Sequence, residues 1–251
     1  MLLELALAAA LTVSSPDDQL LDLTVRRWEF VLFHQEINDR SVSRLETLLQ
    51  GQDIVDVQSP GGDFRASVRM ARLLRERYGR VRVTAECSSG CAIAWTTARE
   101  RMVDGFAAVT FHGSPLSAVK WMRANPTLVR PEEFAEAQAA EAEMLELLDE
   151  AGVAPWLYLC ADRLQNRRYE TTGGLSVEPE RRVTVQEDYE VVWFPRAVLE
   201  AAGVRNLDRY DRPNVRQMAA IETQFGTRAV PRSIYWAQDE DCDVERLGAN
   251  A

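Results

Sequence analysis

The stretch from Val81 to Trp95 constrains the fold most, because an alternating segment passes through a serine turn into a continuously apolar one. The first part alternates apolar and polar residues as a strand does, and the last part is too apolar for a surface helix. Ser88 and Ser89 lie at the junction. There the unpaired N–H groups and the dipole of a helix would stabilise an oxyanion. Either serine can instead simply cap the helix.

Strands and helices alternate around this stretch. The pattern predicts a mostly parallel α/β sheet with right-handed crossovers. The expected strands lie at 28–33, 53–58 and 81–85, and the expected helices at 38–49 and 63–79.

After the serine turn and its helix, two short strands are expected at 101–103 and 108–111, around a turn at Asp104 and Gly105. His112 ends the second strand. It follows Ser89 by 23 residues, with one helix and a short hairpin between them. This interval allows both side chains to reach the same edge of the sheet.

Residues just past the carboxyl ends of parallel strands converge on one edge. Gly61 and Gly62, Ser89 and His112 all occupy such positions. Together they would supply N–H donors, a nucleophile and a general base. The sequence holds one other histidine, His34, which follows the first expected strand.

The segments Ser59-Pro60-Gly61-Gly62, Ser88-Ser89-Gly90 and Phe111-His112 resemble, in order and spacing, motifs of the Clp protease proteolytic subunit. This family belongs to the crotonase-like superfamily of repeated β-α units. Bacterial periplasmic proteins with a Cys-x-Ser-x-Cys turn are more similar still, as in Cys87 to Cys91. The resemblance covers about 28–115 and, more weakly, 187–204.

The resemblance implies that Ser89 is the nucleophile, with Ser88 as its rival, and that His112 is the general base. It also implies that the Gly62 and Gly90 N–H groups form the oxyanion hole. No metal or organic cofactor is implied. Cys87 and Cys91 resemble a metal pair only superficially, because no further ligands complete a set.

The acid that orients the histidine departs from the family pattern. Alignment through Gly203 places Glu187 at that position with Asp188 beside it, although either can be a solvated loop acid. Signal peptide peptidases of the same superfamily use a Ser-Lys dyad instead. Lys120, the one lysine, is the candidate for that role, or an ordinary exposed side chain.

Composition limits the partners. The net charge of -10 and the lack of a basic cluster argue against nucleic acid, and no run reaches the roughly 18 apolar residues of a membrane span.

Residues 1–15 resemble the apolar part of a signal peptide but lack its basic start, so an N-terminal helix is the alternative. The four cysteines suit one or two disulfides in an exported, periplasmic protein, or buried thiols in a cytoplasmic one.

We therefore expect a Clp-like domain at 28–204 and a C-terminal extension at 205–251. The expected activity is peptide hydrolysis, acting on a peptide or protein substrate. A non-catalytic binding or assembly module of the bacterial envelope is the alternative, and acyl-CoA chemistry is a third. Pro131 to Gly152 predicts a long helix, and the resemblance implies that it assembles a homo-oligomer.

Overall fold

The computed structural model describes residues 23–26, 30–49, 54–77, 80–172, 182–188, 191–208, 210–226 and 234–243, so the expected leader lies outside the described residues. The main sheet has the order β1-β2-β3-β4-β5-β10, with β6 pairing with β4. Only β1 and β2 pair antiparallel; every other pair in this sheet is parallel. The mostly parallel α/β fold is therefore confirmed. The strands of this sheet are β1 (Leu23–Arg26), β2 (Val31–His34), β3 (Ile54–Ser59), β4 (Arg80–Ser88), β5 (Glu100–Val103), β6 (Ala108–Thr110) and β10 (Leu207–Asp208).

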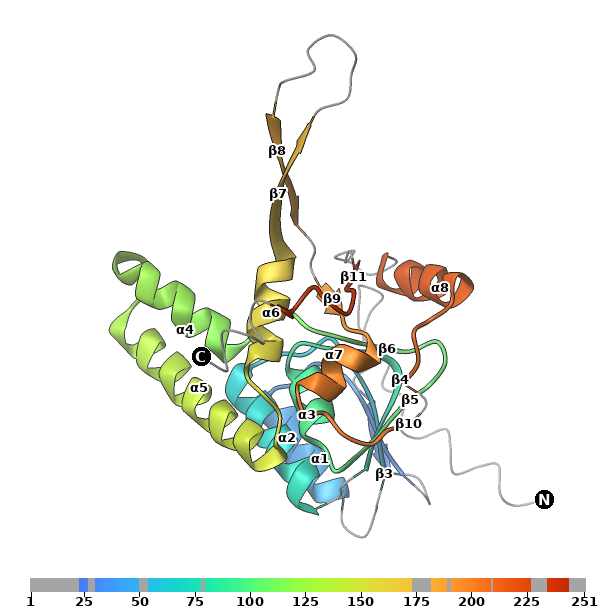
Figure 1. The fold of residues 1–251 in the computed structure, drawn as a ribbon. Coiled ribbons are helices and arrows are strands. Elements are labelled where there is room, and N and C mark those ends of the chain that lie inside the picture. The colour runs from blue at the N-terminus through green and yellow to red at the C-terminus, as the bar shows by residue number, and fades with distance from the viewer. Residues whose placement is uncertain are drawn as a thin grey trace, which may run out of the picture.

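Three helices follow β2, β3 and β4 and lie on one face of the sheet (Figure 1). They are α1 (Asp39–Leu48), α2 (Phe64–Arg77) and α3 (Gly90–Thr97). Every residue of α3 is buried, as its apolar sequence predicts.

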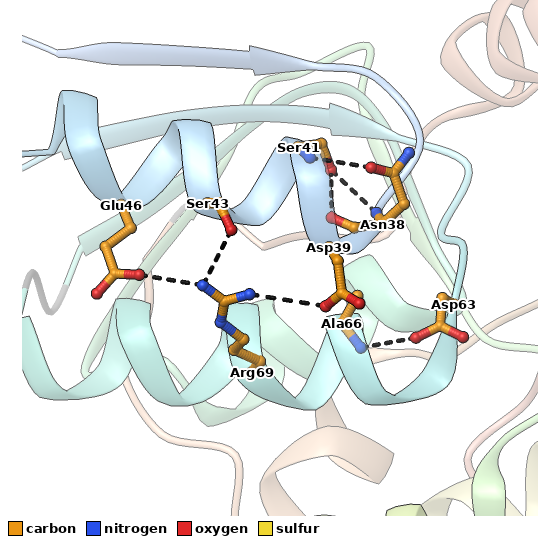
Figure 2. Close-up of polar contacts among 8 residues, drawn as sticks. All are labelled: Asn38, Asp39, Ser41, Ser43, Glu46, Asp63, Ala66 and Arg69. Carbon is orange, nitrogen blue, oxygen red and sulfur yellow. Dashed lines mark hydrogen bonds and ion pairs between the residues drawn. The ribbon is translucent and has the colours of Figure 1, made fainter. Parts of the chain in front are cut away.

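The first turns of α1 and α2 are fixed by side-chain caps. Asn38 and Ser41 form a reciprocal capping box at α1, and Asp63 Oδ1 accepts from the Ala66 N–H at 2.8 Å in α2 (Figure 2). Arg69 reaches from α2 to α1, where it donates to Glu46 at 3.2 Å. These contacts hold the two helices beside the glycine loop, Gly61 and Gly62, which precedes α2.

The expected hairpin at 101–111 is wrong. Both short strands pair with β4 in parallel: β5 runs beside Arg80 to Val83, and β6 beside Glu86 to Ser88. The turn at Asp104 moves the chain along β4 instead of reversing it. As a result β6 ends next to the serine turn.

The long helix is confirmed as α5 (Pro131–Ala151), with Gly152 in the left-handed conformation after it. The apolar pattern of this helix predicts that Leu145 faces inward, but Leu145 is 38% exposed and Leu147 is buried instead. The acidic face of α5 would need arginine partners if this helix assembled an oligomer, but arginine side chains of the same chain already contact it. Arg72 of α2 contacts Glu146 at 2.8 Å and Glu150 at 3.2 Å.

Around α5 lie α4 (Pro115–Ala124), the short 3-10 helix η1 (Pro126–Leu128) and α6 (Trp156–Gln165). The sequence pattern predicts a helix over 153–168, but α6 ends at Gln165 and the chain enters β7 (Asn166–Thr172). This strand pairs with β8 (Arg182–Asp188) in an antiparallel ribbon that projects from the molecule (Figure 1).

The C-terminal part of the chain packs on the domain. β9 (Val191–Trp193) precedes α7 (Arg196–Ala201), and α8 (Val215–Gly226) leads toward β11 (Ile234–Trp236), which pairs with β9. Tyr210 is buried, and Cys242 is bonded to Cys160 of α6. In the described part of the chain, no helix is both long and apolar enough to cross a membrane.

Candidate functional site

Ser89 lies in a strained turn between β4 and α3. Its backbone has φ 55° and ψ -122°, and Asn206 is the one other described non-glycine residue with positive φ. Residues in sparsely populated backbone regions cluster at functional sites. Although Ser89 occupies the N-cap position of α3, its side chain makes no capping hydrogen bond. The interpretation of Ser89 as a cap is therefore wrong.

Backbone contacts and a disulfide hold this turn on both sides. The Ser89 N–H donates to the Thr110 carbonyl at 3.2 Å, and the Ser89 carbonyl accepts from Ala92 at 2.8 Å. Cys87, the next-to-last residue of β4, is bonded to Cys91 in the first turn of α3. The disulfide thus brackets Ser89.

Two glycines allow the surrounding chain to approach the turn. A Cβ atom on Gly61 would lie 2.5 Å from the Ser89 Cβ, and one on Gly90 would lie 1.9 Å from the Ser67 Oγ. Gly61 also has φ 99°, which favours glycine. Any side chain at either position would displace the serine turn or its neighbours.

The glycine loop also orients N–H donors. The Ile37 N–H donates to the Gly61 carbonyl at 2.8 Å, and the Asp63 N–H donates to the Ile37 carbonyl at 2.9 Å. The Gly61 N–H donates to Ser59 Oγ at 3.2 Å. Within the described residues no such partner is found for the N–H of Gly62 or of Gly90, the two predicted oxyanion donors.

His112 shares a pocket with Ser89. The residue before it, Phe111, exchanges two backbone hydrogen bonds of 2.8 Å with Val192, which fixes the end of β6. His112 is half-buried. The pocket has a volume of about 350 Å³ and is lined by Glu36, Pro60, Gly61, Gly62, Phe64, Ser89, His112 and Gly113. The structure therefore brings the predicted nucleophile, base and glycine loop to one cavity.

Ser88, the rival nucleophile, is fully buried and its hydroxyl is engaged. Ser88 Oγ donates to Glu86 Oε1 at 2.6 Å and lies 2.6 Å from Thr110 Oγ1. Because the Thr110 carbonyl also accepts from the Ser89 N–H, this polar cluster helps to hold the turn in place. Ser88 is thus positioned to support the turn and not to attack a substrate.

The carboxylate that would orient His112, Glu187 or Asp188, stays a prediction. Glu187 and Asp188 end β8, and their side chains lie outside the described part of the structure. The chain reaches Val192, the partner of Phe111, four residues after Asp188. Four residues span at most about 14 Å, so the backbone of Asp188 lies within about that distance of Val192.

Sequence reasoning missed Glu36, whose exposed side chain lines the pocket. Glu36 follows β2, and β2 runs parallel to β3. The rule that residues past parallel strands converge on one edge would have found it.

The other predicted candidates lie elsewhere. Lys120 is exposed on α4 and does not line the pocket, so the structure does not pair it with Ser89. His34 ends β2, where burial lowers its pKa, partly opposed by the charge of Asp56. Among the described residues, no group of three or more His, Cys, Asp or Glu side chains is arranged to hold a metal ion.

No family model and no curated protein matches the sequence. Among solved structures, the chain is similar to the ClpP protease catalytic domain from Plasmodium falciparum, with 12% identity, a TM-score of 0.34, and coverage of 49% of this chain and 66% of that one. It is also similar to a ClpP1 variant from Listeria monocytogenes, with 15% identity, a TM-score of 0.34, and coverage of 49% and 72%. A protein from Novosphingobium aromaticivorans described as an enoyl-CoA hydratase/isomerase has 13% identity, a TM-score of 0.30, and coverage of 38% and 49%.

Proposed function

We propose that this protein is a serine hydrolase of the Clp-protease-like type that cleaves peptide bonds. One observation carries the proposal. Ser89 makes no side-chain capping hydrogen bond and lines a pocket together with His112 and Gly62. Ser89 is 9% exposed, and a strained strand-to-helix turn at the N-terminus of a buried helix also positions the nucleophilic serine in other hydrolases.

In the proposed reaction, Ser89 Oγ attacks the carbonyl carbon of the scissile bond while its proton passes to the His112 imidazole. The N–H groups of Gly62 and Gly90 hold the oxyanion of the tetrahedral intermediate. The C–N bond then breaks, and His112 returns the proton to the leaving amine. Water, activated by the same imidazole, hydrolyses the acyl ester and restores Ser89.

The pocket favours a basic substrate. Glu36 is the one carboxylate among the described residues that line it, and the whole chain has a net charge of -10. Both features attract cationic peptides. We expect peptides with Lys beside the scissile bond to be cleaved faster than peptides with Glu there. Replacing Glu36 with Gln should reduce this difference in cleavage rate, whereas Glu132→Gln on α5, which does not line the pocket, should not.

We propose an exported, periplasmic location, in line with the Cys-x-Ser-x-Cys motif. The two disulfides, Cys87 with Cys91 and Cys160 with Cys242, support this proposal because such bonds persist in oxidising compartments.

We propose further that the α4–η1–α5 region mediates self-association. Trp121 of α4 is 54% exposed and Leu128 of η1 is 72% exposed. Contiguous exposed apolar patches often mark contact surfaces, and we propose that these two side chains belong to one. Sedimentation should show a homo-oligomer that Trp121→Glu disrupts, and a monomer at every concentration would contradict the assembly.

Labelling by a serine-reactive phosphonate tests the hydrolase. We expect the natural protein and Ser88→Ala to be labelled and Ser89→Ala to stay unlabelled, with circular dichroism confirming that all three fold. Equal labelling of Ser89→Ala and the natural protein would overturn the assignment. No labelling of the natural protein would favour the non-catalytic binding or assembly module.

A further inference from the structure

The disulfide between Cys87 and Cys91 spans only the serine turn. The two cysteines are four residues apart, and Ser89 is the middle residue between them. One cysteine lies near the end of β4 and the other in the first turn of α3. The bond therefore links the strand to the helix across the residue that has φ 55°.

Such a short bridge does little to tie distant parts of the chain together. Disulfide stabilisation through the unfolded chain increases with the length of the closed loop, and this loop is among the shortest possible. The other disulfide, Cys160 with Cys242, closes a separation of 82 residues. The two bonds thus differ in what they can constrain: one holds a local turn and the other holds the C-terminal part of the chain.

The turn needs a local constraint because a non-glycine residue there is strained. Its other restraints include the hydrogen bonds of Ser89 with Thr110 and Ala92, the side-chain cluster around Ser88, and the close approach of Gly61 and Gly90 to their neighbours. Apart from the main chain itself, none of these is a covalent link between β4 and α3. Both cysteines are fully buried, so the bond is shielded from solvent reductants.

We propose that the Cys87–Cys91 disulfide is a positioning element that holds Ser89 in its reactive conformation, so that full reactivity requires the oxidised turn. This proposal rests on the proposed hydrolase function for its effect on activity. Its structural part, the restraint of the turn, is testable without that function.

The first experiment compares two double variants, Cys87→Ala with Cys91→Ala, and Cys160→Ala with Cys242→Ala. Each is measured at a temperature where circular dichroism shows it folded. We expect removal of the local bridge to lower the rate constant for phosphonate labelling at least about tenfold, since the strained conformation costs energy that the bridge offsets. The long-range variant should label at nearly the natural rate, although it unfolds at lower urea concentration. An equal decrease in the labelling rate constant of both double variants would overturn the proposal. So would an unchanged rate constant in the Cys87→Ala, Cys91→Ala variant.

The second experiment uses hydrogen exchange and does not depend on activity. In the Cys87→Ala, Cys91→Ala variant we expect faster exchange confined to peptides covering residues 84–96. In the Cys160→Ala, Cys242→Ala variant these peptides should stay protected. Unchanged exchange at 84–96 in the first variant would overturn the restraint itself. If the natural protein is not labelled but local exchange rises as expected, the hydrolase function fails and the restraint stands.

Discussion

At the scale of single residues, the account depends on the backbone of Ser89. A helix-capping serine would adopt an extended backbone and bond to the N–H of the next turn. Ser89 does neither, since its φ is positive and its side chain makes no capping bond. Sequence reasoning selected Ser89 over Ser88 by its place in a motif, and the structure adds a physical reason, because the Ser88 hydroxyl is buried and bonded to Glu86.

Gly61→Ala tests whether close approach of the glycine loop shapes the turn. The new Cβ would lie 2.5 Å from the Ser89 Cβ at a position with φ 99°. We expect a loss of about 2 kcal/mol in unfolding free energy and at least about tenfold slower labelling by the phosphonate. Gly152→Ala is the control, because φ there is 67° but nothing lies within 4 Å of the added atom. It should cost about 1 kcal/mol and leave labelling unchanged. Similar labelling by the two variants would contradict this role for Gly61.

His34 should make stability depend on pH. Burial lowers its pKa below 6.5 in the folded protein, so the unfolded chain binds the proton more readily. The contribution is fully present above about pH 6.5 and is lost as the pH falls toward the lowered pKa. As the pH is lowered from 7 to 5.5, we expect the urea concentration at the unfolding midpoint to decrease. This decrease should be smaller in His34→Gln. If the urea midpoint depended on pH in the same way in the natural protein and in His34→Gln, His34 would not be the source of the pH dependence.

At the scale of secondary-structure elements, the alternation of strands and helices was predictable from periodicity, as was the long helix from Pro131 to Gly152. The partners of short strands were not. β5 and β6 look like a hairpin in sequence because a turn separates them, yet each gains its hydrogen bonds from a different part of β4. That choice depends on long-range pairing, and it places His112 beside Ser89.

The C-terminus of α3 is capped by a buried arginine. The Arg101 guanidinium donates to the carbonyls of Trp95 at 3.0 Å and Thr96 at 2.7 Å, and also to that of Ala98. Burial lowers its pKa to about 10. These bonds satisfy carbonyl groups that the end of a buried helix would leave unpaired.

Replacing Arg101 should therefore be costly. We expect Arg101→Gln to reduce the unfolding free energy by about 3 kcal/mol, because buried carbonyls lose their donor. Arg80→Gln is the matched control on the neighbouring strand, where Arg80 pairs with the exposed Glu100 at 2.6 Å, and it should cost less than about 1 kcal/mol. Urea denaturation measures both variants. A cost for Arg101→Gln no larger than that of the control would contradict the capping role.

At the scale of the whole molecule, the contribution of the C-terminal segment could not be foreseen. β10 has two residues and β11 has three, too few for any periodicity to show. Nor does cysteine spacing reveal that Cys242 reaches Cys160. The acid of the site is a similar case, because alignment suggests Glu187 or Asp188 but spacing cannot choose between them.

The long-range disulfide should contribute to global stability. By its loop length, the Cys160–Cys242 bond stabilises the fold by about 4.5 kcal/mol, against about 2 kcal/mol for the short bridge at the serine turn. The two double alanine variants, compared by urea denaturation, should therefore rank in that order. The reverse order would show that the C-terminal segment is held mainly by other contacts.

A crystal structure of the phosphonate-treated protein tests the central claim most directly. The account predicts phosphorus bonded to Ser89 Oγ, with one phosphoryl oxygen about 3 Å from the N–H groups of Gly62 and Gly90 and with His112 facing the adduct. An adduct on another residue, or a phosphoryl oxygen that meets neither N–H group, would contradict it.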